Sequence, residues 1–347
     1  MSRQTALDNI FLRPSARWAH TEYSLDYHRS YLESRVGMPA DSPGFARMTA
    51  DRFAFDFLWS TNDGLTNWAA KGRTTDMGHA VYSADGSDER KPSPSPFRTE
   101  EEVWTFDAVE EYGLPSMSEQ VRAYEQQVRD ARASFPNQLT TGGYYRTIVS
   151  GAIAAFGWDM LLAAAADAKK MERVFDSFFR RTLFHMKCWA QTSVEVIMQH
   201  DDFVWTQGAF MRPEIYRGVI IPRYAELWKP LHEAGKKVIF CSDGDFTEFA
   251  ADIVAAGADG LCFEPCNDFA FMAERFGKTT CLIGSFVDCR DLAMGKADAV
   301  ARAVDRTFET LAGCRGAILA VGNHLAPNIP EGMLDLYFER LFPRLQK

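Results

Sequence analysis

The sequence lacks both a long apolar run and a cluster of basic residues. Its most apolar stretch, residues 151–168, is interrupted by Trp158 and Asp159, whereas a membrane span needs about 20 apolar residues. Residues 1–20 are too polar for a signal peptide. The net charge is −9, and no block of Lys and Arg resembles the phosphate-binding patches of nucleic-acid-binding proteins. We therefore expect neither a membrane nor a nucleic acid as a partner.

Paired cysteine motifs are also missing. The seven cysteines include no Cys-x-x-Cys pair, which excludes a zinc ribbon and a thioredoxin-like motif. Their odd number and apolar surroundings indicate reduced thiols, and hence a cytoplasmic protein. No Gly-x-Gly-x-x-Gly follows an early strand, so a dinucleotide site has no support.

What the sequence does contain is an alternation of short β-rich runs with helical patterns, which predicts a parallel sheet. The short and even spacing of the runs favours one closed, distorted (β/α)8 TIM-type barrel over residues 1–347, with a helical N-terminal extension at about 1–50. The expected strands are 53–59, 138–145, 194–198, 237–240, 260–263, 280–286 and 316–321. The expected helices are 118–134, 169–191, 247–256, 268–276 and 297–311.

One polar stretch, residues 83–99, is rich in Ser, Pro and charge. Because Pro92, Pro94 and Pro96 remove backbone donors at alternate positions, we expect no regular element there. The stretch is interpreted as a long surface loop that either only extends into solvent or covers the active site.

Ionisable and metal-binding side chains follow five successive strands. In parallel barrels the catalytic groups lie at the carboxyl ends of the strands, so these side chains should meet in one pocket. Asp245 and Asp268 precede helical patterns and are interpreted as helix caps instead. The remaining residues are His200, Asp201 and Asp202, then Cys241 and Asp243, then Glu264 and Cys266, then Asp288, and finally Asn323 and His324.

Two chemistries suit this set. A metal ion, with zinc as the candidate, would use Cys241, Asp243, Glu264 and His324, although a Cys at a strand end is often only a small buried residue. Alternatively, His200 or His324 would move protons while Asp201 or Asp202 anchors the substrate. Adjacent acids on a strand point in opposite directions, so only one of these two should face the pocket.

Aromatic residues near the expected strand ends predict a roomy, largely apolar pocket. The candidates for its walls are Trp59, Tyr144, Tyr145 and Trp205. Each of them taken singly is also compatible with ordinary core packing.

From about Val194 onward the sequence resembles the uroporphyrinogen decarboxylase superfamily, which includes corrinoid-linked methyltransferases. The resemblance is carried by residues 200–213, 237–245 and 321–330, and more weakly by Glu22-Tyr23, 55–60 and 156–159. It implies a distorted (β/α)8 barrel, often a homodimer. It also places Glu22, Tyr23, Gln207 and Asn323 among the candidate substrate contacts.

The sequence departs from the family pattern at informative positions. Uroporphyrinogen decarboxylases have an Arg-rich N-terminal segment for the substrate carboxylates, but residues 17–23 here read Arg-Trp-Ala-His-Thr-Glu-Tyr. The methyltransferases use a His-x-Cys pair and a late Cys for zinc, whereas this chain has Cys241-x-Asp243 and Asn323-His324. A metal site with altered ligands and the loss of the metal are both compatible with this pattern. The Asp-x-His-x-x-Gly motif of corrinoid-carrying domains is absent, so a corrinoid would belong to a separate protein.

Three functions follow, in order of preference. The first is methyl transfer from, or demethylation of, a small methylated compound, with a thiol or a separate corrinoid protein as acceptor. The second is decarboxylation of a porphyrinogen-like or smaller carboxylic acid, with Asp201 or Asp202 stabilising a protonated intermediate. The third is a non-catalytic barrel that binds a tetrapyrrole or corrinoid.

Overall fold

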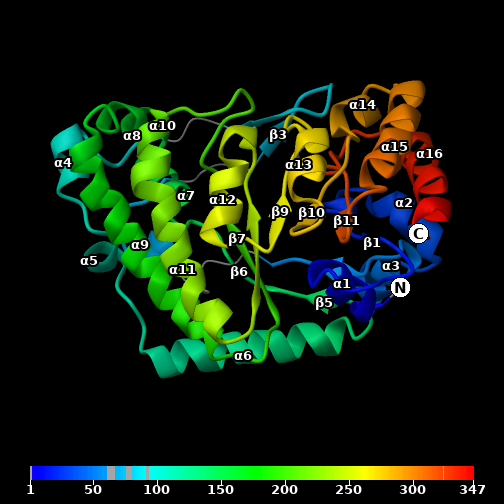
Figure 1. Ribbon diagram of the computed structural model, residues 1–347, viewed down its shortest axis with the longest axis horizontal. Helices are drawn as coiled ribbons and strands as arrows, with labels where there is room; N and C mark the ends of the chain where they lie inside the picture. The colour runs from blue at the N-terminus through cyan, green and yellow to red at the C-terminus, as the bar shows by residue number, and fades with distance from the viewer. Residues whose placement is uncertain (1, 61–66, 76–79, 91–93, 323) are drawn as a thin grey trace.

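Eight parallel strands surround the centre of the molecule in the part of the chain that the structure describes (Figure 1). This computed structural model describes residues 2–60, 67–75, 80–90, 94–322 and 324–347. The barrel strands are β1 (Ala19–His20), β2 (Phe57–Leu58), β5 (Leu139–Thr140) with its continuation β6 (Gly142–Tyr144), β7 (Val196–His200), β8 (Lys237–Cys241), β9 (Gly260–Cys262), β10 (Cys281–Ile283) and β11 (Ala317–Leu319). The prediction of a TIM-type barrel is confirmed.

Strand pairing shows how the barrel closes and why it is distorted. One sheet runs in the order β1-β11-β10-β9-β8-β7-β6, and β2 pairs with β5. Within the described residues, β1 and β2 form no ladder with each other, but the Asp56 amide donates to the His20 carbonyl at 2.9 Å. The Thr21 hydroxyl donates to the Phe57 carbonyl at 2.6 Å. These bonds join the two sheet edges and complete the ring.

Helices cover the outside of the barrel (Figure 1). The predicted helices appear as α6 (Met117–Ser134), α9 (Ala168–Ala190), α12 (Ala250–Ala256), α13 (Phe269–Phe276) and α15 (Ala297–Leu311). The others are α1 (Arg3–Ile10), α2 (Arg29–Val36), α3 (Phe45–Arg52), α4 (Glu100–Trp104), α5 (Ala108–Tyr112), α7 (Val149–Phe156), α8 (Trp158–Ala164), α10 (Pro213–Ile215), α11 (Ile221–Glu233), α14 (Cys289–Ala293) and α16 (Glu331–Leu341). Within the described ranges, no helix is both long and apolar enough to span a membrane.

The N-terminal segment is not a simple extension, which corrects the prediction for residues 1–50. Its β1 strand belongs to the barrel and pairs in parallel with β11. Helix α1 places Leu7 and Ile10 in the same buried cluster as the barrel-interior side chains Val196 and Ile318. Because the interior of an eight-stranded barrel must be filled by side chains, this helix contributes to the barrel core.

The polar stretch 83–99 also differs from the prediction, because it contains a strand. The described part holds β4 (Asp88–Arg90), which pairs antiparallel with β3 (Ala80–Tyr82). The prolines lie beyond this strand, and Gly86 supplies the positive φ of 79° that the connecting turn needs. Asn328 donates to the Ser83 carbonyl at 2.8 Å, so the hairpin lies against the segment that follows β11.

Candidate active site

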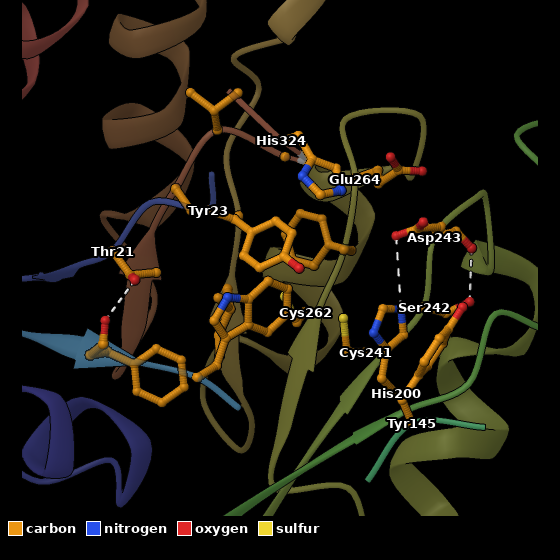
Figure 2. A pocket seen from close by; sticks show the side chains of 18 residues that line it. Thr21, Tyr23, Tyr145, His200, Cys241, Ser242, Asp243, Cys262, Glu264 and His324 are labelled. Atoms are coloured by element: carbon orange, nitrogen blue, oxygen red, sulfur yellow. Dashed lines mark hydrogen bonds and ion pairs between the residues drawn. The ribbon is translucent and has the colours of Figure 1, made fainter. Parts of the chain in front are cut away.

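A cavity opens at the carboxyl ends of the barrel strands, where the sequence predicts the site. It has a volume of about 310 Å³. Figure 2 shows Tyr23 on one side, His200 and Asp243 on the other, Cys241 between them, and His324 with Glu264 above. The eighteen lining residues are Thr21, Tyr23, Phe57, Trp59, Tyr145, His200, Cys241, Ser242, Asp243, Cys262, Phe263, Glu264, Ile283, Gly284, Ala320, Val321, Gly322 and His324.

The polar side of the cavity is built around His200, the last residue of β7. Its Nε2 lies 2.7 Å from Asp202 Oδ1 and 3.9 Å from Asp243 Oδ1. Asp202 also accepts hydrogen bonds from the Tyr145 hydroxyl at 2.9 Å and from the Asp243 amide at 3.0 Å. We call His200, Asp202 and Asp243 the histidine cluster. It joins the ends of β7 and β8, which are adjacent strands paired at His200 and Cys241.

The charges around His200 control its protonation. Burial alone lowers the pKa of this imidazole, but the Asp202 and Asp243 carboxylates raise the pKa to about 9. His200 is therefore a cation at neutral pH and can donate a proton to a bound molecule. It is also packed between rings, because its ring centroid lies 4.6 Å from that of Tyr145 and 6.4 Å from that of Trp59.

The two adjacent acids after β7 have different environments. Asp201 is fully buried and does not line the cavity. It accepts backbone hydrogen bonds from Val149 at 3.0 Å and Ser150 at 2.7 Å, and a bond from the Tyr224 hydroxyl at 2.7 Å. It thus caps the amino end of α7, whereas Asp202 binds His200. This geometry agrees with the expectation that only one of the two acids faces the pocket. It does not agree with the catalytic role considered for Asp201.

His324 lies at the other end of the cavity, away from the histidine cluster. Its Nδ1 is 2.6 Å from the Ser24 hydroxyl oxygen. Its ring lies 4.5 Å from that of Tyr23, 6.2 Å from that of Tyr27 and 6.1 Å from that of Tyr82. His324 therefore belongs to the aromatic rim of the cavity and not to the histidine cluster.

The structure groups different metal-binding atoms from those expected. Cys241, Asp243, Glu264 and His324 all line the cavity, but no three of these described residues bring their ligand atoms within 4.8 Å of one another. The histidine cluster meets that criterion. Burial beside Cys262 raises the pKa of the Cys241 thiol well above its usual value, which opposes the thiolate that a metal needs. One imidazole and two carboxylates remain a chemically suitable ligand set for zinc.

Several predicted substrate contacts need correction. Tyr23 and Trp59 line the cavity, but Glu22 is buried behind it and accepts from the Tyr337 hydroxyl at 2.6 Å and the Val321 amide at 2.9 Å. Tyr144 points outward and accepts a hydrogen bond from Arg181. Trp205 packs on Trp158 and Phe210, and Gln207 is exposed beside it; neither lines the cavity. Asn323 lies outside the described residues.

The reason for these corrections is the alternation of side chains along a strand. Tyr144 and Tyr145 are neighbours, so when Tyr144 faces α9, Tyr145 faces the cavity. Sequence reasoning missed Cys262 and Phe263, which follow the same strand-end rule in β9 and stand next to the predicted Glu264. That rule would have found them if apolar residues had also been considered.

A smaller polar chamber of about 150 Å³ adjoins the cavity. The two share Glu264, Gly322 and His324. Tyr82, Gly86 and Ser87 line the chamber, so the β3–β4 hairpin borders it. The polar stretch 83–99 therefore stands beside the site, as one of its two interpretations required.

Comparisons with known proteins agree with this architecture. The solved methyltransferase from Methanosarcina mazei has a similar fold, with a TM-score of 0.63 and 15% identity over 98% of this chain and 97% of that chain. The GH18 chitinase ChiB from the chitin utilization locus of Flavobacterium johnsoniae is much less similar, with a TM-score of 0.34 and 10% identity over 63% of this chain and 80% of its own. No curated protein matches the chain.

The family assignment rests on the sequence of the second half. The family model for uroporphyrinogen decarboxylase (URO-D) matches residues 146–341, more than half of the chain. The matched span includes β7 to β11 and the histidine cluster. This chain therefore belongs to the uroporphyrinogen decarboxylase (URO-D) family.

Proposed function

We propose that this protein is a methyltransferase that removes a methyl group from a small methylated compound. The acceptor would be a thiol or a corrinoid bound to a separate protein. The observation that carries the proposal is the composition of the cavity: a protonated histidine held by two carboxylates faces aromatic side chains, and no Arg or Lys is among the described lining residues. The predicted homodimer and cytoplasmic location are kept as expectations.

The alternative, decarboxylation of a porphyrinogen, fits the cavity less well. A substrate with many carboxylates needs cationic partners, and the lining acids Asp243 and Glu264 would repel it. Arg17, from the segment that is Arg-rich in true decarboxylases, lies 2.9 Å from the buried Asp56 instead. Because this arginine is already paired with Asp56 next to β2, it is not available to bind a polyanionic substrate.

Methyl transfer gives His200 a defined task. The acceptor attacks the methyl carbon, the bond from that carbon to the leaving atom breaks, and its electron pair stays on the leaving atom. His200 then donates a ring proton to that atom, and Asp202, bound to Nε2, keeps the imidazole oriented and charged beforehand. Tyr145, through its bond to Asp202, holds the carboxylate in place.

Zinc is compatible with the same residues. His200, Asp202 and Asp243 would hold the ion, and a bound zinc would act as a Lewis acid toward the leaving atom. The residues of the chain would still orient the substrate and exclude water from the reacting carbon.

The decisive assay follows methyl transfer from a panel of O-methyl and N-methyl compounds to free reduced cobalamin, read from its absorption spectrum. His200→Gln should lower the rate by about 100-fold or more, which is the usual contribution of a general acid. His232→Gln is the matched control, because His232 forms a similar pair with Asp259 at 2.9 Å outside the cavity. Release of carbon dioxide from porphyrinogens without an acceptor, or full activity of His200→Gln, would contradict the proposal.

A further inference from the structure

Two cysteines stand side by side on adjacent strands of the barrel. Cys241 is the last residue of β8, Cys262 is the last residue of β9, and the two are direct partners in the parallel register. Adjacent strands lie about 4.8 Å apart, and partners in register point to the same face of the sheet. Both side chains line the cavity (Figure 2), and the Cys241 thiol forms a hydrogen bond with Cys262. The two sulfur atoms therefore lie close together in one cavity.

The surroundings of this pair are largely apolar. Both cysteines are free thiols. Cys241 belongs to the buried cluster of the barrel interior that also contains Ile239 and Ile283, and Cys262 packs against that cluster. Cys241 is 3% exposed, and Cys262 is partly exposed. A charged ligand would lose its hydration on reaching these sulfur atoms, so the position favours an uncharged compound that reacts with thiols.

We infer that Cys241 and Cys262 form a dithiol site for trivalent arsenic, which enters the cavity as uncharged arsenous acid, As(OH)3. Two S–H bonds and two As–O bonds break, two As–S bonds and two O–H bonds form, and two water molecules leave. The arsenic stays trivalent and keeps one hydroxyl group. No electron is transferred, and no net charge is created in the cavity. This inference is independent of the proposed function, because it depends only on the positions of the two sulfur atoms.

The geometry of the pair favours arsenic over a metal ion. Trivalent arsenic is pyramidal, so its two sulfur ligands are adjacent, as the sulfurs of two hydrogen-bonded thiols are. A two-coordinate soft ion such as Cu(I) holds two sulfurs on opposite sides instead. Zinc needs four ligands in a structural site. Among the described residues, no group of three potential ligand atoms within 4.8 Å of one another contains both sulfurs.

The test measures the binding of arsenite to the reduced, chelator-treated full chain by native mass spectrometry and calorimetry. One arsenic atom should bind per chain, and two thiols should disappear from a thiol titration. X-ray absorption of the wild-type adduct should show two As–S bonds and one As–O bond. Cys241→Ala and Cys262→Ala should each weaken binding by about 100-fold or more, because the second As–S bond is intramolecular only when both thiols are present.

The matched control is Cys266→Ala, because Cys266 is a thiol of the adjoining chamber, with its Sγ 3.9 Å from Glu264 Oε2. This variant should bind arsenite as tightly as the wild type. Arsenite should also raise the thermal midpoint of the wild type, since the folded chain holds the two sulfurs together. The absorption spectrum and this midpoint use the wild-type chain, so they do not depend on the folding of any variant.

Four results would overturn the inference. The first is tight binding that survives in folded Cys241→Ala or Cys262→Ala, and the second is weaker binding in Cys266→Ala. The third is a wild-type adduct with one or three As–S bonds. The fourth is a thermal midpoint that falls when arsenite is added, which would place the reactive thiols in the unfolded chain.

Discussion

Removing the Asp201 carboxylate should destabilise the protein without direct damage to the chemistry. Asp201 is fully buried and accepts four hydrogen bonds or more, from the first amides of α7 and from the Tyr224 hydroxyl. The residue preceding α7, Ile148, offers no side-chain cap of its own. Asp201 is therefore the group that satisfies this helix end.

The expected magnitude follows from what Asp201→Ala leaves behind. Loss of a helix N-cap costs about 0.5 to 2 kcal/mol. In addition, the Tyr224 hydroxyl loses its acceptor in a buried place, at about 1 to 3 kcal/mol. We expect a decrease of about 3 kcal/mol in the free energy of unfolding. Asp201→Asn keeps one acceptor oxygen and should lower the free energy of unfolding by about half as much.

Urea unfolding followed by circular dichroism measures this decrease. The matched control is Asp268→Ala, because Asp268 caps α13 through the Phe271 amide at 2.9 Å but is exposed, so that its loss should cost only about 1 kcal/mol. Folded Asp201→Asn should retain methyl transfer, whereas Asp202→Asn should lose it. If Asp201→Ala lowers the free energy of unfolding by no more than the control Asp268→Ala does, the reasoning is refuted. So would a folded Asp201→Asn without activity.

The pH dependence of stability should report His200. Since Asp202 and Asp243 raise its pKa to about 9 in the folded state, against about 6.5 unfolded, its stabilisation is complete below pH 6.5 and disappears as the pH rises through 9. This difference between the folded and unfolded pKa corresponds to about 3 kcal/mol in the free energy of unfolding. Urea unfolding of chelator-treated protein should show that the free energy of unfolding decreases over this pH range, and Asp202→Asn should abolish most of the decrease. If the wild-type and Asp202→Asn proteins have parallel pH curves, the pairing of His200 with Asp202 is contradicted. Separately, Gly322→Ala should destabilise by about 1 to 3 kcal/mol, because a Cβ there would lie 2.2 Å from Pro265 Cδ. Gly332→Ala, which meets nothing within 4 Å, should not destabilise; equal thermal midpoints for the two variants would count against this.

The strand-end rule accounts for most of the predicted site residues that line the cavity. Tyr23, Trp59, His200, Asp243 and His324 all line the cavity, because in a parallel barrel the residues after each strand share one edge. The rule requires only that strands be recognised, and the β-rich runs of the second half are clear in the sequence. Strand β1 was missed because two residues, Ala19 and His20, carry no periodic pattern.

Side-chain direction was harder to predict than position. Tyr144 and Tyr145 are identical neighbours in the sequence, and so are Asp201 and Asp202. In each pair, one side chain faces the cavity side while the other contacts a helix. The choice depends on Arg181 and Tyr224, which lie far away in the sequence. No local pattern contains that information.

By itself, then, the sequence determined that this chain forms a closed α/β barrel, that it resembles the uroporphyrinogen decarboxylase superfamily, and on which edge its polar residues gather. Those properties follow from contiguous runs of residues, since periodicity and strand-end chemistry are local. Only the tertiary structure decided that His200 pairs with Asp202 and Asp243 while His324 joins Tyr23, Tyr27 and Tyr82. These partners come together through the register and closure of the barrel, which bring residues as far apart in sequence as Ser24 and His324, 300 positions, into contact.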